Sequence, residues 1–248
     1  MCDVWLDKDA EDRLTGLLRG SVSNYYTFDP FWTQLLSKLP PMYPSDLVGP
    51  TREAVGRYLA SGVTTVYETH NMTPGHIRAY QAMRTDGTLG LRVGAAMEVE
   101  QYAVPPYQPK TEAEFEQSLE LALSLCDDGT DDWLRVSGAT LSEGGPCWSG
   151  LFRTFEPYRD PYGRPTTGRT FVSREKKVRF ARFCAAHDLH ANWVNGGPGD
   201  NEACLDVLTE VAQEIGLRTG AGRSSTPTSS RPRRSSGTHG SGSTSPRR

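Results

Sequence analysis

One stretch of the sequence, residues 171–216, most strongly limits the folds that this chain can adopt. It reads as a helix (SREKKVRFARFCAAHD), a strand (LHANWVN) and a second helix (GGPGDNEACLDVLTEVAQEIG). His190, Asn192 and Asp200 lie on the strand or in the turn that follows it. Parallel α/β enzymes carry their reacting groups at the carboxyl ends of strands, so the pattern predicts an enzyme scaffold of that class.

The rest of the body repeats this alternation of helix and strand. Helical patterns at residues 52–62, 73–87 and 112–129 precede the strand-like runs VTTVYETH, LRVGAAMEV and WLRVSG. About four such alternations predict a parallel sheet with helices packed outside it.

Three further segments do not follow that alternation. The opening VWLDKDAEDRLTGLLRG predicts a short β-hairpin, and a helical stretch is expected near Phe31–Leu39. Residues 138–170 show neither helical nor strand periodicity but contain five aromatic residues. A loop of this length after a strand is typical of a lid or substrate channel.

Composition separates the chain into a body, residues 1–218, and a tail, residues 219–248. The tail contains no acidic, aromatic or large aliphatic residue, so it cannot form a core and is predicted to be disordered. Six of the 27 Lys and Arg residues lie in this tail, whereas all 30 Asp and Glu residues lie in the body. The acidic body argues against nucleic acid as a partner. The tail's Arg pairs could contact acidic partners, but we favour a non-functional end, produced by a frameshift or a wrongly assigned end of the reading frame near Leu217.

The cysteines and the hydropathy pattern indicate where the chain resides. Five cysteines occur without CxxC spacing, which is typical of free thiols in a reducing compartment. The sequence has no secretory leader and no apolar run of 18 residues. We therefore expect a cytoplasmic protein that does not enter a membrane.

Four motifs, in order, resemble the amidohydrolase superfamily, and in particular the amidohydrolase-3 branch that contains N-substituted formamide deformylase. They are LTGLLRG, ASGVTTVYETHNM, LRVSGATLSEGGPCWSG with PYRDPYGRPTTG, and HANWVNGGPGD followed by EACLDVL. Together they span nearly all of residues 1–218. The resemblance implies a TIM-type (β/α)8 barrel with a small β-domain, one or two divalent metals, commonly zinc, and hydrolysis of amide-like, non-peptide C–N bonds. Zinc would supply hydroxide at neutral pH by lowering the pKa of a bound water.

The sequence departs from the metal-ligand pattern that the resemblance implies. No H-x-H occurs, and no Lys lies between Lys110 and Lys176, where the family often has a carboxylated Lys. Asn192 stands roughly where a ligand His is expected. A barrel needs eight strands and about 250 residues, and the body supplies about half of it. The fold class predicted is therefore α/β, a partial TIM-type barrel forming the central part of a longer hydrolase, and we expect that zinc is not retained.

Candidate site residues follow from strand-end position and from the resemblance. The catalytic candidates are His190 and Asp200, and no metal ligand is assigned. The substrate-binding candidates are His70, Arg135, Trp148, Arg159 and Asn192. Structural roles without a function in catalysis or binding stay open for three of these residues. His70 could be a surface histidine, Arg135 could pair with an interior carboxylate, and Arg159 could be a solvated loop charge.

Two functions from different classes are compatible with these residues. The first is a metal-dependent hydrolase that acts on a small amide-like molecule. The second is a catalytically dead barrel fragment or binding module, which the missing ligands favour. The sequence leaves the substrate, the metal and the oligomeric state open.

Overall fold

The computed structural model describes residues 5–19, 34, 38, 40, 43–70, 72–100, 109–127, 131–144, 150–160 and 163–216. Three predictions fall wholly or largely outside these residues. They concern the helix near Phe31–Leu39, the substrate-binding candidate Trp148 and the disordered tail.

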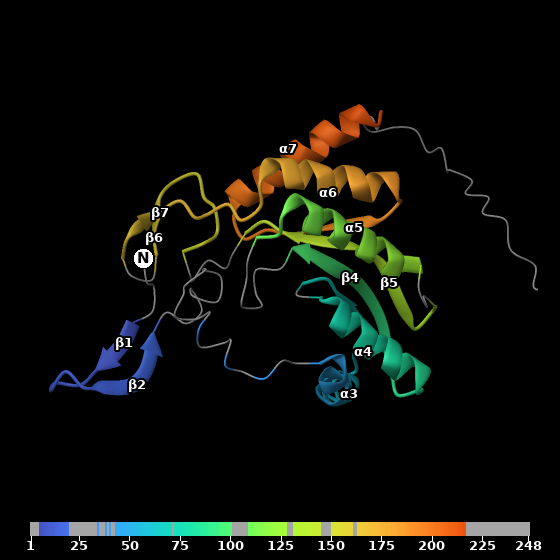
Figure 1. The fold of residues 1–248 in the computed structure, drawn as a ribbon, viewed down its shortest axis with the longest axis horizontal. Coiled ribbons are helices and arrows are strands. Elements are labelled where there is room, and N and C mark those ends of the chain that lie inside the picture. The colour runs from blue at the N-terminus through green and yellow to red at the C-terminus, as the bar shows by residue number, and fades with distance from the viewer. Residues whose placement is uncertain are drawn as a thin grey trace, which may run out of the picture.

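A four-stranded parallel sheet forms the centre of the fold (Figure 1). In spatial order its strands are β3 (Thr65–Glu68), β4 (Arg92–Glu100), β5 (Leu134–Ser142) and β8 (His190–Val194). The helices are α3 (Pro44–Ala60), α4 (Pro74–Thr85), α5 (Glu112–Asp127), α6 (Arg174–Ala186) and α7 (Pro198–Glu214). Each strand is separated from the next by a helix, which confirms the predicted α/β alternation. Four parallel strands are half of what a closed barrel needs, so the fold is a partial TIM-type barrel.

Two small antiparallel ribbons accompany the sheet. β1 (Trp5–Lys8) and β2 (Leu14–Arg19) form the predicted N-terminal hairpin. β6 (Tyr158–Arg159) pairs with β7 (Pro165–Thr166) inside the long segment for which the sequence predicted no strand. That prediction also ended the third strand of the sheet too early. β5 continues to Ser142, because residues 139–142 pair with residues 191–194 of β8 and are buried.

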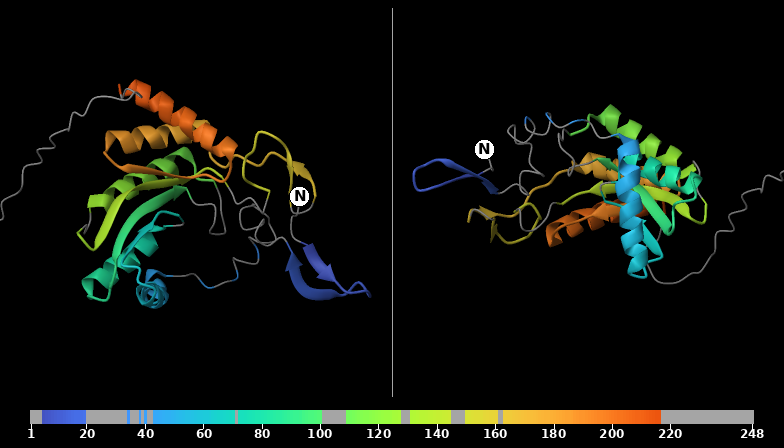
Figure 2. Two further views of the ribbon diagram at one scale, coloured as in Figure 1. Left: turned by 180° about the vertical axis from the view of Figure 1, so that it is seen from behind. Right: turned by 90° about the horizontal axis from the view of Figure 1, so that it is seen from below.

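The two faces of the sheet differ because side chains alternate along each strand. In β4 the odd-numbered residues Val93, Ala95, Met97 and Val99 belong to the hydrophobic core beneath the helices. The core is completed by side chains from α5 and α6, including Phe115, Leu119 and Phe180, each of which is fully buried. Figures 1 and 2 show these helices packed along the curve of the sheet. We call the opposite sheet face, which carries Tyr67, Gly94, Arg135, His190 and Asn192, the inner face.

The helix ends follow the capping pattern of the sequence. Thr73 caps α4 by accepting a hydrogen bond from the backbone N–H of His76 at 3.2 Å, and Pro74 occupies the first turn. Thr111 and Glu114 form the predicted capping box of α5, in which the Thr111 N–H donates to Glu114 Oε2 at 2.7 Å. Among the described residues, no helix has the length and apolar character needed to cross a membrane.

Phe180 offers a direct test of this core. It is fully buried and its ring meets the edge of Trp193 with 5.3 Å between centroids. Replacing Phe180 by Ala should lower the free energy of unfolding by about 3–5 kcal/mol, because it removes buried apolar surface and leaves a cavity. Urea denaturation measures the change. Phe155→Ala is the matched control, since Phe155 is 62% exposed and its loss should cost less than about 0.5 kcal/mol. Equal losses for both variants would contradict this placement of the core.

Candidate active site

Three strands bring polar side chains together at the carboxyl end of the sheet. His70 follows β3, Glu98 lies on β4 and Ser142 ends β5. Parallel strands end at the same edge, so residues that are far apart in sequence meet there. The backbone N–H of Glu98 donates to the Met72 carbonyl at 2.9 Å, and this bond holds the segment that carries His70 against β4.

The His70–Glu98–Ser142 cluster joins an accessible imidazole to a buried carboxylate. The Glu98 side chain is completely buried, whereas the His70 side chain is 38% exposed. His70 Nδ1 lies 3.4 Å from Glu98 Oε2 and 3.5 Å from Ser142 Oγ. The Ser142 hydroxyl donates to Glu98 Oε1. A carboxylate beside Nδ1 orients the imidazole and leaves Nε2 for proton transfer, which is a common arrangement for a general base.

A second group of charges, also at this edge, surrounds Glu143. The Lys177 ammonium donates to Glu143 Oε1 at 2.5 Å, and Arg153 Nη1 lies 3.7 Å from the same oxygen. Burial raises the pKa of the Glu143 carboxyl, Lys177 opposes that rise, and the Asp200 charge adds to it. Glu143 Oε2 is buried and accepts no hydrogen bond within the described part of the chain.

A third buried pair lies beside these two groups. Lys176 Nζ is 2.9 Å from Glu100 Oε2 and also donates to the Lys110 carbonyl at 2.6 Å. Burial lowers the pKa of the Lys110 ammonium, and the Glu100 carboxylate opposes that effect. Lys176 and Lys177 are consecutive residues in the first turn of α6, so one helix end contacts the ends of both β4 and β5.

Asp200, a predicted catalytic residue, is buried at the start of α7. Its Oδ2 accepts hydrogen bonds from the backbone N–H groups of Gly197 at 2.8 Å and of Gly196 and Arg153 at 3.2 Å. These contacts connect the β8–α7 turn to the long loop after β5. Gly144 lies against this carboxylate so closely that a Cβ there would be 2.3 Å from Oδ2.

The inner face carries three other candidates, Arg135, His190 and Asn192, around a cavity of about 560 Å³. The Tyr67 hydroxyl crosses the sheet from β3 and donates to Asn192 Oδ1 at 3.0 Å. The Asn192 amide donates to the Ala139 carbonyl at 3.2 Å. Asn192 thus uses both ends of its amide within the protein. His70 lies at the strand ends, so the structure does not place all the candidates in one group.

Arg159, the remaining substrate-binding candidate within the described residues, lies on β6. Its guanidinium is exposed and donates to the Gly163 carbonyl at 2.5 Å. Arg159 therefore stabilises the turn of the β6–β7 ribbon.

Several residues of the site were not among the sequence candidates. They are Tyr67, Glu98, Ser142, Glu143 and Lys177. A signal for Glu98 was present, because a carboxylate within the apolar run LRVGAAMEV must find a partner when the strand is buried. No comparable signal marks Tyr67, whose hydrogen-bond partner is 125 residues away in the sequence.

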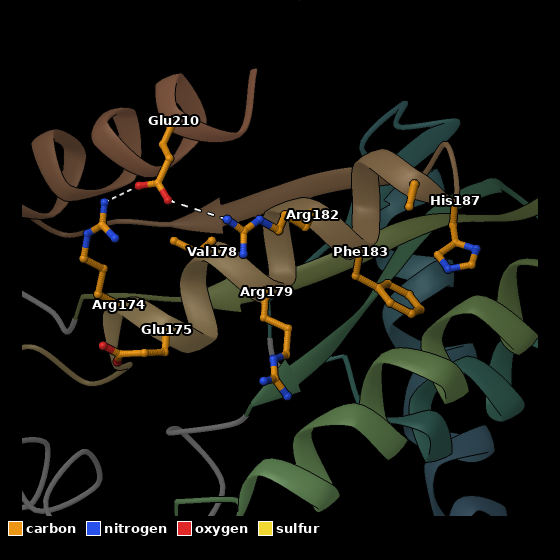
Figure 3. Close-up of a pocket in the computed structure, with 9 residues that line it drawn as sticks. Arg174, Glu175, Val178, Arg179, Arg182, Phe183, His187 and Glu210 are labelled. Carbon is orange, nitrogen blue, oxygen red and sulfur yellow. Dashed lines mark hydrogen bonds and ion pairs between the residues drawn. The ribbon is translucent and has the colours of Figure 1, made fainter. Parts of the chain in front are cut away.

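A further cavity, about 640 Å³ in volume, lies on the outer surface of α6 (Figure 3). Its three arginines all have carboxylate partners. Arg174 binds Glu210, Arg179 Nη1 lies 2.5 Å from Glu116 Oε1, and Arg182 Nη2 lies 2.6 Å from Glu214 Oε1. Because these charges are already paired, we place no functional site in this cavity.

Comparisons with known proteins reveal similarity in fold but not in sequence. No protein-family model and no curated protein sequence matches the chain. An uncharacterised metal-dependent hydrolase from Pyrococcus horikoshii OT3 superposes with a TM-score of 0.54 at 18% identity, over 69% of this chain and 32% of that one. Its counterpart from Pyrococcus furiosus also has a TM-score of 0.54 at 18% identity, over 72% and 34%. A triazine hydrolase variant has a TM-score of 0.42 at 17% identity, over 71% and 36%. The chain thus spans about a third of the length of the solved structures that it matches.

The raised pKa of Glu143 predicts a pH-dependent stability. Folded Glu143 keeps its proton to a higher pH than unfolded Glu143. Its contribution to the free energy of unfolding is therefore fully present below the ordinary glutamate pKa of 4.5 and is lost as the pH rises through the folded pKa. Relative to Glu143→Gln, the wild-type free energy of unfolding should therefore fall as the pH rises above the ordinary glutamate pKa of 4.5. Urea denaturation at several pH values measures this difference.

Glu114→Gln supplies a control of opposite sign. The backbone N–H of Thr111 lowers the pKa of Glu114. The contribution of Glu114 to the free energy of unfolding is therefore present above the ordinary glutamate pKa of 4.5 and is lost as the pH falls through the folded pKa. A difference for Glu143→Gln that stays flat or rises with pH would contradict the predicted environment of Glu143.

Proposed function

We propose that the chain is a hydrolase of amide-like, non-peptide C–N bonds, and that its reaction takes place at the His70–Glu98–Ser142 cluster. The observation that carries the proposal is an accessible histidine on a fully buried carboxylate at the carboxyl end of a parallel sheet. This is the edge at which TIM-type barrels carry out chemistry. The likeness in fold to two proteins described as metal-dependent hydrolases supports the reaction class.

The proposed reaction uses His70 as a general base. With its Nδ1 directed at Glu98, the ring presents Nε2 to a water molecule and takes a proton from it. The resulting hydroxide attacks the carbonyl carbon and forms a C–O bond. The protonated His70 then delivers its proton to the nitrogen as the C–N bond breaks, so a carboxylic acid and an amine leave. Glu98 stabilises the imidazolium between these two steps, and the Ser142 hydroxyl holds Glu98 in place.

Zinc, which the resemblance to amidohydrolases implies, does not fit the described residues. Among them, no group of three or more His, Cys, Asp or Glu side chains could hold a metal ion. Catalytic zinc is held by three protein ligands, whereas His70 and Glu98 provide two possible donors. The proposed steps therefore use only side chains of the chain itself.

A barrel fragment without catalytic activity, or a binding module, is the second candidate. The observation that favours it is the same incomplete set of metal donors in the described part of the chain. In this alternative the His70–Glu98 contact only stabilises the loop after β3. The two candidates differ in one measurable property, which is turnover that depends on His70.

The purified chain should hydrolyse an N-substituted formamide, and His70→Ala should lower kcat/KM by about 10²–10⁴-fold, as loss of a general base does. Glu98→Gln should lower kcat by more than it changes KM, because it removes the orientation of the base rather than a substrate contact. Release of the amine measures the rate, with and without added zinc.

His187→Ala is the matched control, since His187 is an exposed histidine at the C-cap of α6 and has no part in the proposed reaction. It should retain wild-type turnover. If the wild-type chain shows no turnover under either metal condition while it remains folded, the hydrolase proposal is wrong and the binding-module alternative stands. Equal losses for His70→Ala and His187→Ala would also refute the assignment of the base.

A further inference from the structure

The inner face contains a group of hydrogen-bond donors that the proposed hydrolysis does not use. Arg135 and Ser137 on β5 and His190 on β8 line the same cavity, of about 560 Å³, together with Tyr67, Gly94 and Asn192. None of these six residues is acidic. Within the described residues, Arg135 forms no ion pair, and the side chains of Ser137 and His190 form no hydrogen bond. The cavity thus offers a fixed positive charge and two more potential donors, without a carboxylate among its lining residues.

The local structure shows why these three side chains share one cavity. Ala95 pairs with Val136, and the next residue of β4, Ala96, pairs with Gly138, so Ser137 is the extra residue of a β-bulge. Regular alternation along β5 places Arg135 and Ser137 on the cavity side while Val136 lies in the core, and the bulge at Ser137 lets Ala139 and Leu141 lie in the core as well. Bulges of this kind redirect side chains and are frequent beside functional sites. Gly138 pairs with His190, which brings the start of β8 alongside the bulge.

Two glycines, Gly94 and Gly138, allow the close approaches that form this cavity. A Cβ at Gly94 would lie 2.7 Å from Cδ2 of Tyr67, so only glycine lets that ring lie across β4. A Cβ at Gly138 would lie 2.1 Å from the His190 carbonyl oxygen, so β8 could not approach β5 so closely with any other residue. The Tyr67 ring, held by its hydroxyl contact to Asn192, then forms an aromatic wall of the cavity.

A neighbouring cavity limits how strong such a site can be. It shares Arg135, Ser137 and His190 but is also lined by Asp127 and Asp188. Neither carboxylate forms an ion pair with Arg135, so the guanidinium is not neutralised by contact. Their negative charges still reduce the positive potential near the cavity, and we therefore expect weak binding that responds to salt.

We propose that the inner-face cavity binds the anionic group of a small molecule, a carboxylate or a phosphate, through Arg135, Ser137 and His190. Arg is suited to both groups because its planar guanidinium can donate two parallel hydrogen bonds. The Tyr67 ring favours a ligand with a flat apolar part next to its charge. This inference does not depend on the proposed hydrolysis, because binding alone tests it.

Titration with benzoate and with inorganic phosphate, each at low ionic strength and followed by calorimetry or NMR, tests the proposal. Wild-type chain should bind at least one of them, and Arg135→Gln should weaken that binding about tenfold or more, as loss of a charged hydrogen bond does. His190→Gln should weaken it by a smaller factor, and added sodium chloride should weaken it progressively. Binding of benzoate alone indicates a carboxylate ligand, and binding of phosphate alone indicates a phosphate ligand.

Arg78→Gln is the matched control. Arg78 is also exposed and without an ion-pair partner among the described residues, but it lies on α4 and lines neither cavity. It should bind the anion like wild type. If neither anion binds at millimolar concentration, or if Arg78→Gln and Arg135→Gln lose binding equally while both remain folded, the inner-face site is refuted. Unfolding curves of both variants establish that they are folded.

Discussion

The first turn of α6 joins the helix layer to the sheet through two buried ion pairs. Lys176 contacts Glu100 at the end of β4, and Lys177 contacts Glu143 just beyond β5. Removing one partner of such a pair typically costs 3–5 kcal/mol, because the other charge is left buried without compensation. The carboxyl edge of the sheet depends on both contacts being made, since Glu98 and Ser142 lie on the same two strands. The pairs thus set the relative position of the strand ends that carry the proposed base and its carboxylate.

The polar regions at the two ends of the sheet differ in how their charges are balanced. At the carboxyl end of the sheet, Glu98, Glu100 and Glu143 are almost completely buried and each faces a cationic or hydroxyl partner. Nearer the start of the strands, Arg135 and His190 face a cavity without such partners in the described part of the chain. Buried charges must be matched within the protein because water cannot solvate them. Exposed charges such as Arg135 carry no such requirement and are therefore available to a ligand.

Most helices, the strands of the central sheet and their succession along the chain could be predicted from the sequence because local patterns encode them. The start of α3 was not, since this helix begins at Pro44 rather than at residue 52. Thr73 with Pro74, and Thr111 with Glu114, marked helix starts, and the run LRVGAAMEV marked a strand. The end of β5 at Ser142 could not be predicted, because glycine and small polar residues there give no strand signal. Residues 139–142 are strand only because β8 pairs with them.

For the candidate residues, too, the sequence predicted some features and only the tertiary structure decided others. The sequence predicted His190 at the carboxyl end of its strand, but His190 is the first residue of β8 and lies at the amino end. The resemblance added Asn192 as the place of an expected ligand. Only the tertiary structure decided their contacts. Asn192 accepts from Tyr67, Asp200 accepts from three backbone N–H groups, and Arg135 forms no ion pair among the described residues. The sequence by itself determined the α/β alternation, because hydrophobic period and capping are local properties, whereas the half-barrel was implied by the resemblance. The partners of His70 and the surroundings of Arg135 depend on strand order and on close approaches at glycine, which arise only when distant segments pack.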